Sequence, residues 1–184
     1  MSFKAINEFE GVYVDQIESN TDFRGTFLKF SPGKFGFPAI DSIALSMNPK
    51  IGTLRGMHFQ IEPYAEEKIV TCVRGAIYDA IIDMRPDSKS FGEVGVLNLS
   101  QENGLQIYLP KGIAHGFQTL QPDTIVHYFL SSPFSAKHSY SIDPFEDNKI
   151  NWPIETFHLA EKDKSGIPFM SAAKSFSDSL IKEV

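Results

Sequence analysis

Short runs in which apolar and polar residues alternate, or apolar residues follow one another, fill most of the 184-residue chain. Gly, Pro, Asn and Asp separate these runs, as in SPGKFGFP, RPDSKSFG and LPKG. Period-two alternation, many β-branched and aromatic residues, and frequent turns are typical of antiparallel sheets. The pattern predicts ten strands, over residues 11–17, 25–30, 43–47, 52–59, 68–75, 76–84, 94–100, 105–110, 116–120 and 125–132.

Helical periodicity is scarce and is confined to the end of the chain. Residues 148–166 have room for a turn or two of helix, and residues 171–184 predict a terminal helix. We therefore expect an all-β body, a sandwich or barrel of jelly-roll type, with a short, partly helical C-terminal tail. The length fits one domain over residues 1–184, with the tail from about Asp143 packed across the body.

Composition and charge exclude some classes of function. A net charge of −6 argues against a nucleic-acid-binding protein, but a local cluster of Lys and Arg still suits a small anionic ligand. The single cysteine, Cys72, excludes an internal disulfide. No apolar stretch is long enough to span a membrane, and the first residues lack the pattern of a signal peptide. These features predict a cytoplasmic protein.

Two segments bounded by glycine, residues 56–75 and 104–120, resemble the signature motifs of the cupin superfamily of small β-barrels. In metal-binding cupins these motifs supply His-x-His, a downstream Glu and a further His. The matching positions here are His58, Gln60, Glu66 or Glu67, and His115. Because a glutamine replaces one histidine ligand, we expect no metal and no other cofactor.

A more specific resemblance comes from six motifs in order: DFRGTF, GTLRGMHFQ, EEKIV, VRGAIYDAIIDMRPDSKSFG, LPKGIAHGF and INWP. Together they resemble the dTDP-4-dehydrorhamnose 3,5-epimerase family roughly from Gly11 to Asp163. Members of that family are isomerases, cupins that have lost the metal and invert ring carbons flanking the ketone of a nucleotide-linked 4-keto-6-deoxyhexose. The resemblance implies a nucleotide-diphosphate sugar substrate, a role in deoxysugar and polysaccharide synthesis, and a homodimer in which an N-terminal arm crosses to the partner.

The resemblance also assigns four catalytic roles. His58 matches the base that removes the proton next to the ketone, and Asp163 matches the carboxylate that orients it. Tyr128 matches the acid on the opposite ring face, and Lys68 matches the lysine beside the 4-keto oxygen. A neutral imidazole is a suitable base near pH 7, and a positioned cation stabilises the enolate that forms.

Substrate-binding roles follow from the same resemblance. Arg24 and Arg55 match positions that hold the diphosphate, where a planar guanidinium suits phosphate oxygens. Gln60, His115 and Lys162 complete the expected substrate contacts. Arg24 lies in the arm segment, so we expect it to serve the site of the partner subunit.

Three positions depart from the family pattern: Lys29 replaces a glutamate, Phe134 replaces a tyrosine, and Ser139 replaces a glutamate. These departures leave open which nucleotide is bound and whether one or two carbons are inverted. The alternatives are a 3-epimerase, a 3,4-ketoisomerase, a non-catalytic sugar-nucleotide-binding cupin and a metal-dependent cupin oxygenase.

Each residue also has a simpler interpretation when it is taken alone. An isolated histidine on an apolar strand is more often a core residue hydrogen-bonded to backbone, and a lone tyrosine is most often a packed aromatic. Lys68 alone predicts a solvated strand-edge charge. The Glu66–Glu67 pair predicts a solvated loop.

Overall fold

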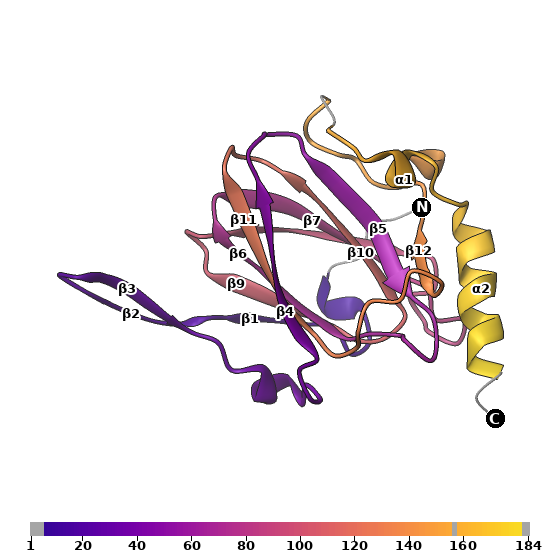
Figure 1. The fold of residues 1–184 in the computed structure, drawn as a ribbon, viewed down its shortest axis with the longest axis horizontal. Coiled ribbons are helices and arrows are strands. Elements are labelled where there is room, and N and C mark those ends of the chain that lie inside the picture. Colours follow the sequence, from indigo (N-terminus) through magenta and orange to yellow (C-terminus); the bar gives the residue numbers. More distant parts are fainter. Residues whose placement is uncertain (1–5, 156–157, 182–184) are drawn as a thin grey trace.

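Two five-stranded antiparallel sheets face each other in the computed structural model, which describes residues 6–155 and 158–181 (Figure 1). Sheet I has the order β1 (Tyr13–Gln16), β9 (Leu105–Leu109), β6 (Lys68–Arg74), β11 (Thr124–Leu130) and β4 (Ser42–Asn48). Sheet II has the order β12 (Ser139–Ser141), β5 (Leu54–Gln60), β10 (Ile113–Thr119), β7 (Ala76–Asp83) and β8 (Val94–Ser100). The hairpin of β2 (Glu18–Asp22) and β3 (Gly25–Lys29) projects from the body as an arm.

The predicted jelly-roll barrel with its helical tail is confirmed, and all ten predicted strands are present. The strand expected over residues 116–120 begins earlier, at Ile113, and so includes His115. Two strands were not predicted. The sequence of β2 is ESNTD, which has no apolar face, and β12 is only three residues long.

Helices are few in the described residues. Three short 3-10 turns lie at η1 (Ile6–Glu8), η2 (Pro32–Phe35) and η3 (Glu146–Asn148), and the α-helices are α1 (Glu161–Lys164) and α2 (Phe169–Ile181). Over these residues, no helix combines the length and apolar character that crossing a membrane requires.

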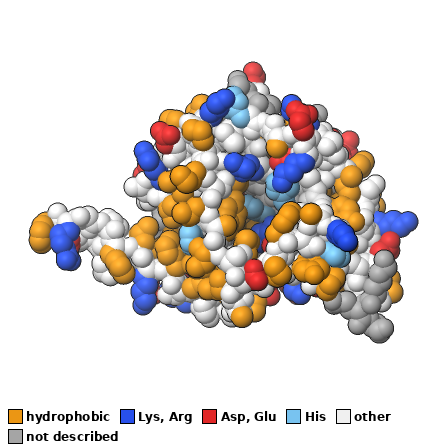
Figure 2. Space-filling view, in the orientation of Figure 1, with side chains coloured by type: hydrophobic (Ala, Val, Ile, Leu, Met, Phe, Trp, Pro, Cys, Tyr) orange, Lys and Arg blue, Asp and Glu red, His pale blue; other side chains and the backbone are white. Residues whose placement is uncertain are grey.

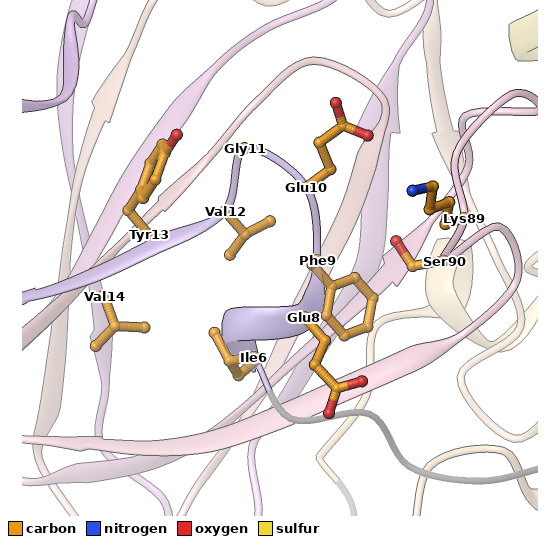
Figure 3. Close-up of a pocket in the computed structure, with 10 residues that line it drawn as sticks. All are labelled: Ile6, Glu8, Phe9, Glu10, Gly11, Val12, Tyr13, Val14, Lys89 and Ser90. Atoms are coloured by element: carbon orange, nitrogen blue, oxygen red, sulfur yellow. The ribbon is translucent and has the colours of Figure 1, made fainter.

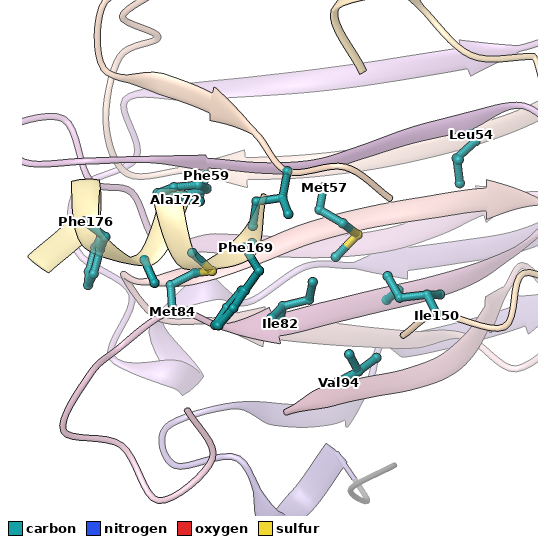
Figure 4. Close-up of a cluster of buried hydrophobic side chains, with 14 of the residues drawn as sticks. Leu54, Met57, Phe59, Ile82, Met84, Val94, Ile150, Phe169, Ala172 and Phe176 are labelled. Carbon is teal, nitrogen blue, oxygen red and sulfur yellow. The ribbon is translucent and has the colours of Figure 1, made fainter. Parts of the chain in front are cut away.

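Side-chain alternation divides the core into three layers. Ile77, Ile107 and Val126 belong to the layer between the two sheets. A second layer lies on the outer face of sheet II, where Met57 and Phe59 pack under the tail and α2 (Figure 4). The third lies on the outer face of sheet I, where Phe37, Ile69, Tyr108 and Phe129 cluster.

The C-terminal tail crosses the outer face of sheet II, as predicted. Phe169 and Phe176 of α2 are buried there, and each such burial contributes about 1.5–3 kcal/mol to folding (Figure 4). Leu54 N–H donates to the carbonyl of His158, and Ile167 N–H donates to the carbonyl of Ser141. A Cβ on Gly166 would lie 2.4 Å from the backbone nitrogen of Asp143, so only glycine allows this approach. These contacts fix α1, which carries Asp163, against sheet II.

Strands β5 and β10 approach each other unusually closely at two facing glycines. A Cβ on Gly116 would lie 2.6 Å from Met57 Sδ and 2.8 Å from the carbonyl oxygen of Arg55. Gly56 faces it with a φ of 119°, a backbone conformation that favours glycine. The approach and an adjacent irregularity in the pairing place His115 directly opposite His58.

We therefore expect Gly116→Ala to lower the free energy of unfolding by about 1–3 kcal/mol, because the added methyl overpacks backbone and buried sulfur. Urea unfolding followed by tryptophan fluorescence measures the change. Gly33→Ala is the matched control, since no atom lies within 4 Å of its added Cβ, and we expect a change within roughly 0.5 kcal/mol. Equal stability of the two variants would contradict the close approach.

Candidate active site

A cavity of about 300 Å³ lies between the two sheets, with titratable side chains from both. His58 and His115 enter it from sheet II, and Lys68 and Tyr128 enter it from sheet I. The space-filling view shows Lys and Arg side chains around a central hollow with histidine inside it (Figure 2). The cavity thus combines acid–base groups with a positively charged entrance.

His58 and Asp163 form a hydrogen-bonded pair. His58 Nε2 lies 2.6 Å from Asp163 Oδ1, although the two residues are 105 positions apart in the chain. Asp163 is buried and also accepts the Ser141 hydroxyl at 3.0 Å and, more weakly, the Gly56 N–H at 3.4 Å. With Nε2 bound to the carboxylate, the other ring nitrogen, Nδ1, is the one available for proton abstraction.

Charge and burial keep this pair in the states that a base requires. Burial lowers the pKa of His58, the Asp163 carboxylate opposes that shift, and the positive charges of Lys162 and Lys68 add to it. Burial alone would raise the pKa of Asp163, but the hydrogen bonds from His58, Ser141 and Gly56 outweigh it and hold that pKa below its ordinary value. His58 is therefore neutral and Asp163 ionised at pH 7.

The pKa shift of His58 predicts the acid limb of the pH–rate profile. For a reaction in which neutral His58 is the base, we expect the acid limb of kcat/KM to lie below the ordinary histidine pKa of about 6.5 and to reach a tenfold fall per pH unit at still lower pH. Asp163→Asn removes the charge that raises the pKa of His58, so the acid limb of the pH–rate profile of this variant should move to lower pH. Initial rates across pH 4.5–8 measure both profiles. A limb that moves to higher pH in Asp163→Asn would contradict this arrangement.

His115 belongs to a second pair. Its Nε2 lies 2.7 Å from Oδ1 of Asp79, a fully buried residue of β7 whose other oxygen has no hydrogen-bond partner among the described residues. Burial raises the pKa of Asp79, and the neighbouring His115 opposes that shift. Sequence reasoning missed Asp79, although a carboxylate inside the apolar run AIYDAIIDM is itself a signal, because such a group needs a partner.

Lys68 is buried at the start of β6, so the simpler interpretation as a solvated strand-edge charge does not apply. Its Nζ lies 3.0 Å from Glu66 Oε1 and 3.5 Å from the carbonyl oxygen of His58. An ammonium has three protons, so one remains for a ligand in the cavity. Glu66 and Glu67 do not form a solvated loop either: Glu66 pairs with Lys68, and Glu67 accepts the Tyr108 hydroxyl at 2.7 Å.

Tyr128 lines the cavity from β11, on the sheet opposite His58. Its ring meets the His115 ring edge-on with centroids 6.1 Å apart. Burial, together with the negative charge of Asp79, raises the pKa of Tyr128, so the phenol keeps its proton at neutral pH. The neighbouring His127 points to the other face of sheet I, where it stacks on Phe30.

The predicted substrate-binding residues do not all reach the cavity. Arg55 and Lys162 line it, and His115 is inside it. Arg24 lies on the exposed arm, paired with Asp22, and is absent from the residues that line this cavity. Of the three departures, Phe134 and Ser139 line the cavity, whereas Lys29 lies on the arm and pairs with Glu18.

Gln60 lines the cavity, but its amide is occupied elsewhere. Its Nε2 donates to the carbonyls of Tyr64 and Pro133, and its Oε1 accepts the Ser135 N–H at 2.7 Å. The side chain therefore fixes the segment that carries Phe134 against β5. This use accounts for a glutamine at a position where metal-binding cupins have histidine.

The cupin positions for metal ligands are already paired with other groups. His58 bonds Asp163, His115 bonds Asp79, and Glu66 bonds Lys68. Within residues 6–155 and 158–181, no cluster of three or more His, Cys, Asp or Glu side chains is placed to hold a metal ion.

A larger hollow of about 740 Å³ lies beside the N-terminal segment (Figure 3). Glu8, Glu10, Lys89 and Ser90 are among its lining residues, and none of the described residues around it is a histidine. Among its described lining residues it lacks the hydrogen-bonded histidine–carboxylate pairs found in the cavity between the sheets. The cavity between the sheets is therefore the candidate active site.

The facing sheets, the tail that supplies Asp163 and the paired titratable groups define a cupin barrel with an acid–base site. Comparison with known proteins identifies which cupins it resembles. The chain matches the profile of the family described as dTDP-4-dehydrorhamnose 3,5-epimerase over residues 7–171. This match covers most of the chain, which therefore belongs to the dTDP-4-dehydrorhamnose 3,5-epimerase family.

Individual relatives agree with that assignment. The chain is 46% identical over 123 residues to a dTDP-4-dehydrorhamnose 3,5-epimerase of Sinorhizobium fredii, an alignment that covers 65% of this chain and 63% of that protein. The chain thus spans a little under two thirds of the length of this relative. A dTDP-4-dehydrorhamnose 3-epimerase of Streptomyces niveus is 30% identical over 165 residues, covering 86% of this chain and 79% of that protein.

Solved structures share the fold. The crystal structure of dTDP-4-dehydrorhamnose 3,5-epimerase from Bacillus anthracis, with TDP and PPi bound, is 33% identical and superposes with a TM-score of 0.81. The superposition covers 85% of this chain and 93% of that one. The similarity therefore extends over most of the chain and is not limited to the signature motifs.

Proposed function

We propose that this protein is an epimerase that inverts C3, C5 or both in a nucleotide-linked 4-keto-6-deoxyhexose, with dTDP-4-keto-6-deoxyglucose as the first substrate to test. The observation that carries the proposal is the placement of the His58–Asp163 pair and Tyr128 on facing sheets that line one cavity. Membership of the family supports the choice of substrate.

Each inversion needs two proton transfers on opposite ring faces. His58 Nδ1 takes the proton from the carbon next to the ketone, and the C–H electron pair moves into the ring while the carbonyl becomes an enolate. Lys68 and His115 stabilise the negative charge on the enolate oxygen. Tyr128 then gives its proton to the carbon from the other face, and the ketone re-forms. Exchange with solvent returns the proton to the phenolate and removes it from His58.

General acid–base catalysis and stabilisation of the enolate would each contribute a large factor to the rate. A positioned acid or base contributes about 10²–10⁴-fold to rate. A donor to the developing oxyanion contributes a comparable factor, on the order of 3–4 kcal/mol. The cations at the entrance, Arg55 and Lys162, would hold a diphosphate and fix the sugar with respect to His58.

A second candidate function is inversion at C3 alone. It is favoured by Phe134, which lines the cavity without the hydroxyl that the family usually has there. A relative of this chain is a dTDP-4-dehydrorhamnose 3-epimerase. Loss of one hydroxyl changes how the sugar ring is held for the second proton transfer.

Incubation with several 4-keto-6-deoxy sugar nucleotides in D₂O, followed by proton NMR, tests the proposal. Deuterium at C3 and C5 with inversion supports the double epimerase, and label at C3 alone supports the second candidate. Transfer of the ketone from C4 to C3 would identify a 3,4-ketoisomerase. Binding of a sugar nucleotide without any deuterium uptake would leave a non-catalytic binding protein and overturn the proposal.

We also propose that two copies form the functional unit. Ile43, Leu45 and Met47 alternate along the edge strand β4 and are exposed. Figure 2 shows hydrophobic side chains beside the central hollow. An exposed apolar edge strand is a site for association. Arg24, at the end of the arm, would then enter the site of the partner subunit.

We expect Leu45→Asp to convert the dimer to a monomer, because it places a carboxylate in an apolar interface. Light scattering after size-exclusion chromatography measures the mass. The matched control is Leu180→Asp on α2, where leucine is also partly exposed but lies on the other side of the barrel. A Leu45→Asp variant with the mass of the wild type would contradict this interface.

Domain organisation and cellular location are properties of the whole chain. We propose that it acts as one domain, since the tail supplies Asp163 to a site built on the two sheets. We also propose a cytoplasmic location, which is supported by a single, buried cysteine.

A further inference from the structure

Arg55, a cation that lines the cavity, has a neutral side chain as its hydrogen-bond partner. Its Nε–H donates to Asn48 Oδ1 at 2.8 Å. No carboxylate among the described residues pairs with it, whereas Lys68, Arg85 and Lys111 each pair with one. The partner of Arg55 is a neutral amide, which fixes the guanidinium without cancelling its charge.

The amide of Asn48 is itself held rigidly. Asn48 is the last residue of β4 and is 2% exposed. Its Nδ2 donates to the carbonyls of Ser46 and Thr124, and its Oδ1 accepts the Ser46 hydroxyl as well as Arg55. All four hydrogen-bonding positions of the amide are therefore used.

The hydrogen bonds also define which way the amide points. A flipped amide would place its NH₂ against the Arg55 Nε–H and its oxygen against two carbonyl oxygens. Arg55 consequently meets an acceptor whose position is set by two neighbouring strands, β4 and β11. The terminal nitrogens Nη1 and Nη2 have no partner among the described residues, and Arg55 lines the cavity.

We propose that Asn48 is a positioning residue, which orients the Arg55 guanidinium so that its terminal nitrogens present a fixed, uncancelled charge to the diphosphate. This inference rests on the proposed function for the identity of the ligand. A planar guanidinium binds phosphate oxygens through two parallel N–H bonds, so its affinity depends on orientation as well as on charge. A carboxylate in place of the amide would still accept from Arg55 but would cancel its charge, and its second oxygen would face the carbonyls of Ser46 and Thr124.

The test is calorimetric titration with TDP, together with kcat and KM. We expect Asn48→Ala to weaken TDP binding about tenfold, a typical loss for a hydrogen bond to a charged group, and to raise KM by a similar factor while kcat at saturation changes less than threefold. Asn48→Asp should weaken binding as well, with a shallower dependence of log Kd on salt concentration because the site has lost a net charge. This near-isosteric variant keeps the test valid if Asn48→Ala does not fold.

A double-mutant cycle separates positioning from a general structural effect. If Asn48 acts through Arg55, then Asn48→Ala should have no further effect on TDP affinity in an Arg55→Ala background. The matched control is Asn103→Ala, since the amide of Asn103 likewise bonds backbone groups, three in this case, but lies in the β8–β9 turn. That variant should lose stability without losing TDP affinity.

Three results would overturn the inference: unchanged TDP affinity in Asn48→Ala and Asn48→Asp, equal losses in the wild-type and Arg55→Ala backgrounds, or a loss confined to kcat. Failure of the proposed function is distinguishable from these, because in that case the wild-type protein itself would not bind TDP or would not label the sugar.

Discussion

Replacing His58 by asparagine is expected to lower kcat by about 10²–10⁴-fold, the contribution of a positioned general base. Asp163 still accepts the Ser141 hydroxyl and the Gly56 N–H, so the buried carboxylate keeps hydrogen-bond donors when the imidazole is removed. The amide has no basic nitrogen, so the proton next to the ketone is left without an acceptor. Initial rates with a 4-keto-6-deoxy sugar nucleotide at pH 7.5 measure the loss.

Two controls limit the interpretation of this result. Affinity for TDP should be unchanged in His58→Asn, because the diphosphate contacts are assigned to other residues. His158→Asn should keep wild-type activity, since the bonds of His158 to the described residues, Leu54 and Gly52, are made by its backbone. Activity of His58→Asn within threefold of wild type would remove His58 as the base.

Tyr128→Phe has the second large effect that we expect, a fall of about 10²–10⁴-fold in the rate at which inverted product forms. The variant loses only the hydroxyl, so the ring still packs beside His115. Loss of the hydroxyl removes the group that we propose as the proton donor, on the sheet opposite His58. The quantity to measure is the initial rate of appearance of the inverted sugar, followed by NMR or chromatography.

The matched control is Tyr108→Phe. This variant also loses a tyrosine hydroxyl, one that donates to Glu67. Tyr108, however, lies on the outer face of sheet I. We expect a loss of stability of about 1 kcal/mol and unchanged activity. A Tyr128→Phe variant that inverts the sugar at the wild-type rate would favour a 3,4-ketoisomerase-type site or another acid.

The strands were predictable because alternation in this chain is regular and turn residues separate the runs. The body of the barrel follows from that pattern alone. The β2 strand was not predictable, because all five of its side chains are exposed and polar residues there give no period-two signal. The short β12 depends on pairing with β5, a contact that no local sequence pattern encodes.

The candidate site was only partly predictable from the residues. His58 stands out as a titratable group in an apolar strand, but its pairing with Asp163 joins positions 105 residues apart and was inferred from family resemblance. Glu66 was interpreted as solvated, because sequence does not show that Lys68 is buried beside it. Asn48 gave no signal, since its importance depends on the register between β4 and β11.

The most direct test of the central claim, that base and acid act from opposite faces of one ring, is deuterium exchange at C3 in D₂O by the two variants. The account predicts that Tyr128→Phe incorporates deuterium at C3 with unchanged configuration, because His58 removes the proton and returns a deuteron to the same face. It predicts that His58→Asn neither labels nor inverts the sugar. Deuterium uptake by His58→Asn at the wild-type rate, or no exchange in Tyr128→Phe, would contradict it.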